Sequence, residues 1–148
     1  MTGFNHGMNG AVIALAVRRP EIAVPLAFIS HYAADFVPHY GHSHGKVLTR
    51  QFNQFLAADF IIALICMAIL GVLFPHKLVL IWLCMVVAAV PDLIWWFYRK
   101  SVKQWPKGLD RFTTWHYRVN SRSHINHLYF DAAWFGLIWA AALWFKLR

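Results

Sequence analysis

The sequence is poor in charged residues, and in acidic residues above all. Charged side chains make up 14% of the 148 residues, and six residues are Asp or Glu, whereas hydrophobic residues make up 59%. Ordinary soluble domains carry about 25% charged residues. A soluble chain of this length could not bury so much apolar surface in one core. The scarcity of charge therefore excludes an ordinary soluble domain and predicts a protein whose solvent is lipid.

Cysteine is also scarce, and its placement excludes two kinds of site. Cys66 and Cys84 are the only cysteines, and both lie in apolar runs without a CxxC pair. They predict neither a disulfide framework nor a cysteine metal site, and we expect them to be packing residues. A signal-peptide pattern is missing too, because the basic residues Arg18 and Arg19 follow the apolar stretch 11–17 instead of preceding it. We expect a mature chain that starts near Met1.

The net charge of +8 comes from basic residues that lie mostly outside the apolar runs. No basic stripe is interleaved with aromatic residues, so the sequence does not indicate a nucleic-acid partner. Basic loops beside apolar segments are typical of membrane proteins, in which they face anionic lipid. We therefore expect membrane lipid as the partner and no nucleic acid.

The apolar runs predict an all-α, polytopic membrane bundle in a single domain, residues 1–148. Three runs, 52–74, 78–98 and 128–145, are close to the ~20 residues needed to cross ~30 Å of hydrocarbon. The short turn Pro75-His76-Lys77 makes the first two an antiparallel hairpin. Prolines at both ends of a second helix predict an N-terminal helical hairpin over 6–37. The sum is about four to five membrane helices.

The connection 99–127 holds seven of the 14 Lys and Arg residues. Apolar positions recur in it at helical spacing from Leu109 to Val119, which predicts a short interfacial helix on the membrane surface. By the positive-inside rule, this connection and the loop 39–50 lie in the cytoplasm, and the turn at Lys77 lies outside. The pattern indicates a multi-pass protein of a bacterial-type inner (cytoplasmic) membrane.

Four of the six acidic residues lie inside predicted membrane helices, where a carboxylate costs about 2.5–3.5 kcal/mol. They are Asp35, Asp59, Asp92 and Asp131. In chain order, these residues lie near the end, the start, the end and the start of their helices. Because successive helices run antiparallel, all four share one side of the membrane. Of the nine histidines, all except His76 are expected on that side. This convergence predicts a polar site that faces the cytoplasm.

Two histidine–aspartate pairs have the same spacing, His31 with Asp35 and His127 with Asp131. Residues four apart lie one turn above each other on a helix, so the two side chains can bind one metal ion. The alternative is a buried His–Asp hydrogen bond that only locks helices together. We favour a site for a divalent metal, zinc first, because two pairs occur with two further carboxylates at matching depth. The predicted metal ligands are His31, Asp35, His39, Asp92, His116, His124, His127 and Asp131, and the catalytic candidates are Asp59 and His6.

Three short motifs resemble those of bacterial inner-membrane metal-dependent hydrolases. They are His6 with Gly10, Pro91-Asp92, and Ser30-His31 with Asp35. Ile94 stands where that family has a second acid, and the motifs come in a different order. The segment 31–39 is also similar to the HxxxD element of zinc-dependent phospholipases. Both resemblances imply metal-assisted hydrolysis.

The sequence thus favours a metal-dependent hydrolase that acts on a lipid or lipid-linked ester or phosphoester at the cytoplasmic leaflet. An anionic lipid substrate would be drawn by the basic connection 99–127. One alternative is a non-catalytic membrane subunit or transporter-like bundle, whose buried Asp and His lock helices or pass ions or protons. A second is a histidine-ligated redox membrane protein, although the HxxHH clusters of di-iron oxidases are missing.

The orientation is tested by cysteines introduced singly in place of Ser43, Ser101 and His76. In intact cells, an impermeant thiol reagent should label the cysteine at position 76 and leave the other two protected, because only the Lys77 turn is expected outside. Labelling at position 101 without labelling at position 76 would invert the assignment.

Overall fold

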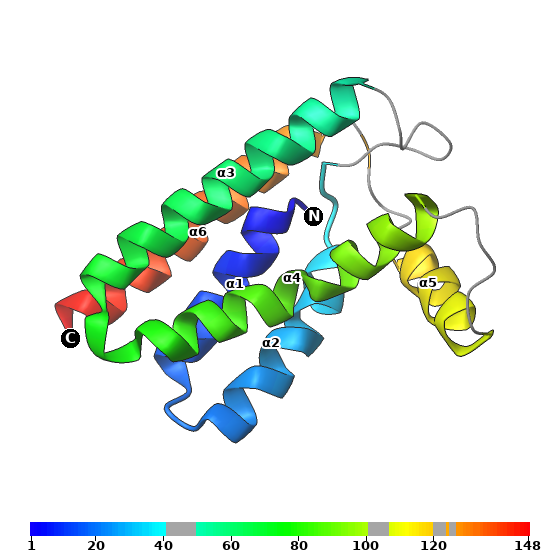
Figure 1. Ribbon diagram of the computed structural model, residues 1–148. Helices are drawn as coiled ribbons and strands as arrows, with labels where there is room; N and C mark the ends of the chain where they lie inside the picture. Colours follow the sequence, from blue (N-terminus) through cyan, green and yellow to red (C-terminus); the bar gives the residue numbers. More distant parts are fainter. Residues whose placement is uncertain (41–49, 101–106, 120–123, 125–126) are drawn as a thin grey trace.

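The computed structural model describes residues 1–40, 50–100, 107–119, 124 and 127–148. Six α-helices and one 3-10 turn make up this part of the chain, and it contains no β-strand (Figure 1). The elements are α1 (Gly3–Ala16), α2 (Pro20–Asp35), α3 (Arg50–Leu73), η1 (Pro75–Lys77), α4 (Leu78–Lys100), α5 (Lys107–Val119) and α6 (Leu128–Leu147). The prediction of an all-helical bundle is therefore confirmed.

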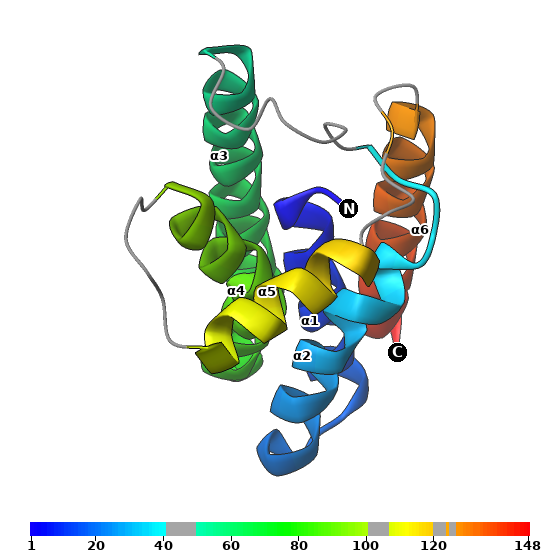
Figure 2. The same cartoon turned by 90° about the vertical axis from the view of Figure 1, so that its right-hand side faces the viewer.

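The short helix α1 is the centre of the bundle. It contacts α2, α3, α4 and α6, most extensively α4, and Figure 2 shows it between α3 and α6. Its sequence alternates small residues such as Gly7, Ala11 and Ala14 with larger apolar ones, so neighbouring helices can approach on several sides. Two polar residues near its start, Asn5 and His6, are buried together with its small residues. This burial carries polar side chains into the interior of the protein.

Gly10 sets how closely α1 and α4 approach each other. A Cβ atom at this position would lie 2.6 Å from the carbonyl carbon of Cys84, closer than real side-chain atoms come. At Gly7, one turn earlier, the nearest atom to such a Cβ is Cε of Met85 at 3.6 Å, an ordinary contact. Only glycine therefore permits the observed packing at position 10, and that packing places His6 beside α4.

Three helical segments are long and apolar enough to cross a membrane, namely Phe52–Leu73, Pro75–Phe97 and Leu128–Leu147. They coincide with the three spans expected from the sequence. Their outward faces carry large apolar side chains, for example Phe60 at 63%, Val72 at 81% and Val79 at 78% exposure. Exposed apolar surface of this extent is compatible with a lipid environment.

The other elements refine the predicted boundaries. The hairpin expected over 6–37 is formed by α1 and α2, which have 14 and 16 residues. At 1.5 Å per residue these helices measure only about 21 and 24 Å, short of the ~30 Å hydrocarbon core. Helix α4 continues to Lys100, beyond the predicted end at residue 98. A helix, α5, is present in the segment where the interfacial helix was expected, and Thr113 and His116 on it are buried.

The close approach at Gly10 is tested by comparing Gly10→Ala with Gly7→Ala. The first variant should lower the free energy of unfolding in detergent by about 1–3 kcal/mol, because the added methyl overpacks the α1–α4 contact. The second should be neutral or stabilising by up to about 1 kcal/mol, since Ala favours the helix over Gly. Thermal or denaturant unfolding of the purified protein measures both. Equal effects at the two positions would contradict the close approach.

Candidate metal centre

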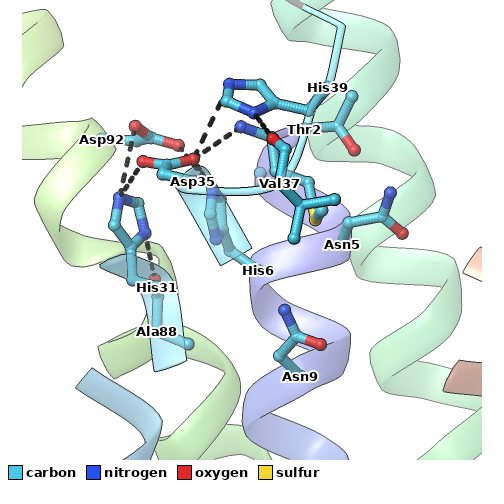
Figure 3. Close-up of polar contacts among 12 residues, drawn as sticks. Thr2, Asn5, His6, Asn9, His31, Asp35, Val37, His39, Ala88 and Asp92 are labelled. Carbon is cyan, nitrogen blue, oxygen red and sulfur yellow. Dashed lines mark hydrogen bonds and ion pairs between the residues drawn. The ribbon is translucent and has the colours of Figure 1, made fainter. Parts of the chain in front are cut away.

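Side chains from four helices converge beside the start of α1. His6 comes from α1, His31 and Asp35 from the end of α2, Asp92 from α4 and His116 from α5. We call these five residues the His/Asp cluster. The three histidines and Asp35 are at most 1% exposed, whereas the Asp92 side chain is 29% exposed. Figure 3 shows the Asp35 and Asp92 carboxylates close together, with the His31 ring turned toward both.

The orientation of the His31 ring is fixed by the backbone of α4. Its Nδ1 lies 2.8 Å from the carbonyl oxygen of Ala88, which can only accept, so Nδ1 carries the proton. In the neutral ring Nε2 then has a free lone pair, and it lies 3.3 Å from Asp35 Oδ2 and 3.7 Å from Asp92 Oδ1. Proteins commonly orient a metal-binding imidazole by a hydrogen bond from its other ring nitrogen to a carbonyl oxygen.

His116 approaches the same oxygens from the other side. Its Nε2 lies 2.9 Å from His31 Nε2, 3.3 Å from Asp35 Oδ2 and 3.6 Å from Asp92 Oδ1. One ring proton can satisfy only one of these contacts. The Nδ1 atom of His116 is buried and has no hydrogen-bond partner within the described residues. The arrangement resembles ligand atoms around a cation more than a hydrogen-bond network in which every polar atom has a partner.

His6 completes the cluster. Its Nε2 lies 3.1 Å from Asp35 Oδ1 and 3.7 Å from Asp92 Oδ2. Neither ring nitrogen makes a hydrogen bond within the part of the chain that the structure describes, although both are buried. A buried polar atom without a partner costs about 1–3 kcal/mol. A cation between the ring and the carboxylates would remove that cost.

The charges of His6 and Asp35 suit a metal ligand set. Burial, together with the neighbouring His31, lowers the pKa of His6 to about 4, so the ring is neutral at pH 7. Burial alone would raise the pKa of Asp35, but the N-terminal ammonium, 2.7 Å from Oδ1, holds it well below its usual range. Burial would lower the pKa of His31, but Asp92 and Asp35 outweigh it and raise this pKa. A neutral imidazole and an ionised carboxylate are the forms that bind metals.

The cluster therefore has the composition and spacing of a site for a divalent metal. One donor atom from each of His6, His31, Asp35 and Asp92 lies within 4.8 Å of the others. Imidazole nitrogens and carboxylate oxygens are the ligands of zinc and of other divalent transition metals. The structure thus supports the predicted metal-binding group in part, and it leaves the identity of the metal a prediction.

Asp131 lies at the N-terminus of α1, outside the His/Asp cluster. Its Oδ1 accepts hydrogen bonds from the backbone N–H and the hydroxyl of Thr2, both at 3.0 Å, and from the Asn5 amide at 3.1 Å. Its Oδ2 accepts from the backbone N–H of Tyr40. The contacts explain this buried carboxylate by hydrogen bonding to a helix start, where negative charge is also favoured by the helix dipole.

Asp59, predicted as a catalytic residue, also accepts hydrogen bonds at the start of α1, but from α3. Its two carboxylate oxygens accept from the backbone N–H groups of Gly3 at 3.1 Å and Phe4 at 3.2 Å. These are N–H groups of the first helical turn, which have no partner inside the helix. Asp59 on α3 and Asp131 on α6 together hold the start of α1, and so they position His6.

The second predicted pair does not form a one-turn arrangement, because α6 begins only at Leu128. His127 precedes the helix, and its ring contacts Tyr129 and Phe130. The backbone N–H of His124 donates to the carbonyl of His39. Both rings lie outside the four-residue metal-binding group. His39 is nearer, with Nε2 3.9 Å from Asp35 Oδ1.

Several contributors were not predicted from the sequence. Thr2 and Asn5 bind Asp131, and the Ala88 carbonyl orients His31. Thr2 stands at the N-cap of α1, a place where threonine is favoured, so a helix-start signal could have identified it. A backbone carbonyl such as that of Ala88 leaves no signal in a sequence.

Comparison with protein-family models, with curated proteins and with solved structures found no match. The resemblance to membrane hydrolases therefore rests on the short motifs alone.

Asp131→Asn and Asp92→Asn distinguish the helix anchor from the cluster. Asp131→Asn should destabilise the protein by about 1–3 kcal/mol, because the new amide group faces N–H donors. Its melting temperature should still rise on addition of zinc as much as that of the wild type. Asp92→Asn should lose most of this rise, which reflects a stabilisation of about 2.7 kcal/mol when zinc is present at 100 times Kd. Loss of the zinc response in both variants would indicate that Asp131 is a metal ligand, as the sequence predicted.

Proposed function

We propose that this protein is a membrane-embedded, divalent-metal-dependent hydrolase that acts on a lipid or lipid-linked ester or phosphoester. The observation that carries the proposal is the His/Asp cluster, which is assembled from four helices and is buried except at Asp92. Its rings and carboxylates are oriented toward one another, and three ring nitrogens of His6 and His116 have no hydrogen-bond partner within the described residues. Hydrolysis is the activity that the resemblance to membrane hydrolases implies, and zinc is the metal we expect.

The residues have separate parts in this reaction. His6, His31, Asp35, Asp92 and His116 would hold the metal, which when bound polarises the scissile group and activates water. The water oxygen bonds to the carbonyl carbon or the phosphorus, the ester C–O or P–O bond breaks, and one water proton passes to the leaving alcohol. Asp92, the most exposed member of the cluster, is the one best placed to meet water and substrate.

An apolar pocket of a size suited to a lipid chain lies between α1, α2 and α6. It has a volume of about 410 Å³. Ser30 and Ala34 line it and directly precede His31 and Asp35 in the sequence, although no cluster residue lines the pocket. Ligand pockets of about 300–1,000 Å³ lined mainly by apolar side chains are typical of small-molecule sites. An acyl chain in this pocket would lie along α2, the helix that carries His31 and Asp35.

The membrane setting is proposed on the same terms. We place the protein in a bacterial-type inner membrane with the cluster toward the cytoplasm, because the basic residues favour that side. Arg111 and Arg118 on α5 are exposed and would attract an anionic headgroup. A count of four to five membrane helices requires α1 and α2 to enter the bilayer too, and it stays a prediction. So does the interfacial position of α5.

A non-catalytic membrane protein is the second candidate, and Asp59 and Asp131 favour it. Asp131 is buried and Asp59 is half-buried, and both accept hydrogen bonds from the start of α1. If the His/Asp cluster only locks helices as they do, the protein will neither retain metal nor hydrolyse lipid. A histidine-ligated redox protein differs from both by its visible absorption.

The proposal is tested with purified protein in detergent or nanodiscs, by elemental analysis and by release of a fluorophore from phospholipid analogues. Wild type should retain a divalent metal and hydrolyse an analogue in a chelator-sensitive way. His31→Ala should reduce hydrolysis by about 100-fold or more, since even partners behind the ligands contribute 10–100-fold. His76→Ala, at an exposed histidine in η1, is the matched control and should leave metal and activity unchanged. Wild type without metal, even after its addition, would favour the structural role.

A further inference from the structure

The His/Asp cluster has two halves, and each is built around one oxygen of Asp35 and one of Asp92. In the first half, Nε2 of His31 and Nε2 of His116 both face Asp35 Oδ2, each at 3.3 Å, and Asp92 Oδ1, at 3.7 and 3.6 Å. In the second half, His6 Nε2 lies 3.1 Å from Asp35 Oδ1 and 3.7 Å from Asp92 Oδ2. Each carboxylate thus presents one oxygen to each half.

We propose that the cluster is a dinuclear centre, in which Asp35 and Asp92 bridge two divalent ions. His31 and His116 complete the first site, and His6 completes the second. This inference rests on the proposed metal-dependent function and specifies the form of its metal centre.

The contacts divide into two sets, one for each half. Within the first half, the separations of 2.9 to 3.7 Å bracket the ~3.4 Å edge of a tetrahedron with metal–ligand bonds of about 2.1 Å. Four ligand atoms therefore surround one position in that half. His6 faces a second position, beside the other oxygens of Asp35 and Asp92.

The stacking of two rings gives the spacing between the positions. The imidazoles of His6 and His31 lie nearly parallel, with ring centroids 3.8 Å apart and an interplanar angle of 23°. Each ring directs Nε2 to a different oxygen of Asp35, so ions bound in the two ring planes would be separated by a similar distance. Two-metal sites in proteins have separations of about 3.5–4 Å.

The second half already attracts positive charge. The ammonium group of Met1 lies 2.7 Å from Asp35 Oδ1, the oxygen that His6 faces. A divalent ion in this half would take the place of that ammonium. His39 is the nearest additional imidazole, with Nε2 3.9 Å from the same oxygen and Nδ1 donating to the Val37 carbonyl. The Nδ1 contact directs Nε2 toward Asp35.

Metal stoichiometry and magnetic coupling of the full-length wild type test the proposal without any substitution. After reconstitution with Mn²⁺ in nanodiscs and removal of loosely held ions, we expect two ions per chain. The electron paramagnetic resonance spectrum should show an exchange-coupled pair in place of the six-line signal of isolated Mn²⁺. One ion per chain with an uncoupled signal would overturn the dinuclear centre and leave the metal-dependent function standing. No bound ion with Mn²⁺ or with zinc would overturn both.

Single substitutions assign the two positions. His6→Ala and His116→Ala should each retain one ion and give an uncoupled signal, because each removes a ligand of a different half. His127→Ala, which removes a histidine outside the cluster, should keep two coupled ions. Loss of all metal in both His6→Ala and His116→Ala, with each variant still helical and monodisperse, would indicate one shared site and overturn the inference.

Discussion

The backbone N–H groups at the start of a helix have no partner inside the helix, and in α1 this problem arises within the protein interior. Asp59 and Asp131 solve it by accepting hydrogen bonds from Thr2, Gly3 and Phe4. These carboxylates come from α3 and α6, two of the helices long and apolar enough to cross a membrane. The central helix is thus tied to its neighbours at the end where His6 emerges. The His/Asp cluster depends on this tie.

The four carboxylates in these helices divide into two classes according to the groups that they face. Asp59 and Asp131 face backbone and side-chain hydrogen-bond donors in sufficient number. Asp35 and Asp92 face imidazole nitrogens, Asp35 also faces the Met1 ammonium group, and some of the ring nitrogens around them have no hydrogen-bond partner within the described residues. Both classes answer the cost of placing a carboxylate in an apolar setting, but only the second leaves room for a cation.

The convergence of Asp35, Asp59, Asp92 and Asp131 could be predicted from antiparallel helices alone, because the path of the chain decides which helix ends meet. The pairing of His31 with Asp35 could also be predicted, since both residues lie within one helix. The similar pair at His127 could not be settled, because the start of α6 at Leu128 decides it and helix ends are the least certain feature of a sequence. The division of the four carboxylates into two roles depends on contacts with α1, which sequence periodicity does not reveal.

The anchor on Asp131 also sets an order on the maturation of the protein. Thr2 and Asp131 are separated by 129 positions, so α6 must emerge from the ribosome before this hydrogen bond can form. Until then, the N–H groups at the start of α1 are only partly satisfied. A nascent chain in which α6 has not yet emerged therefore holds the start of α1 through Asp59 without Asp131.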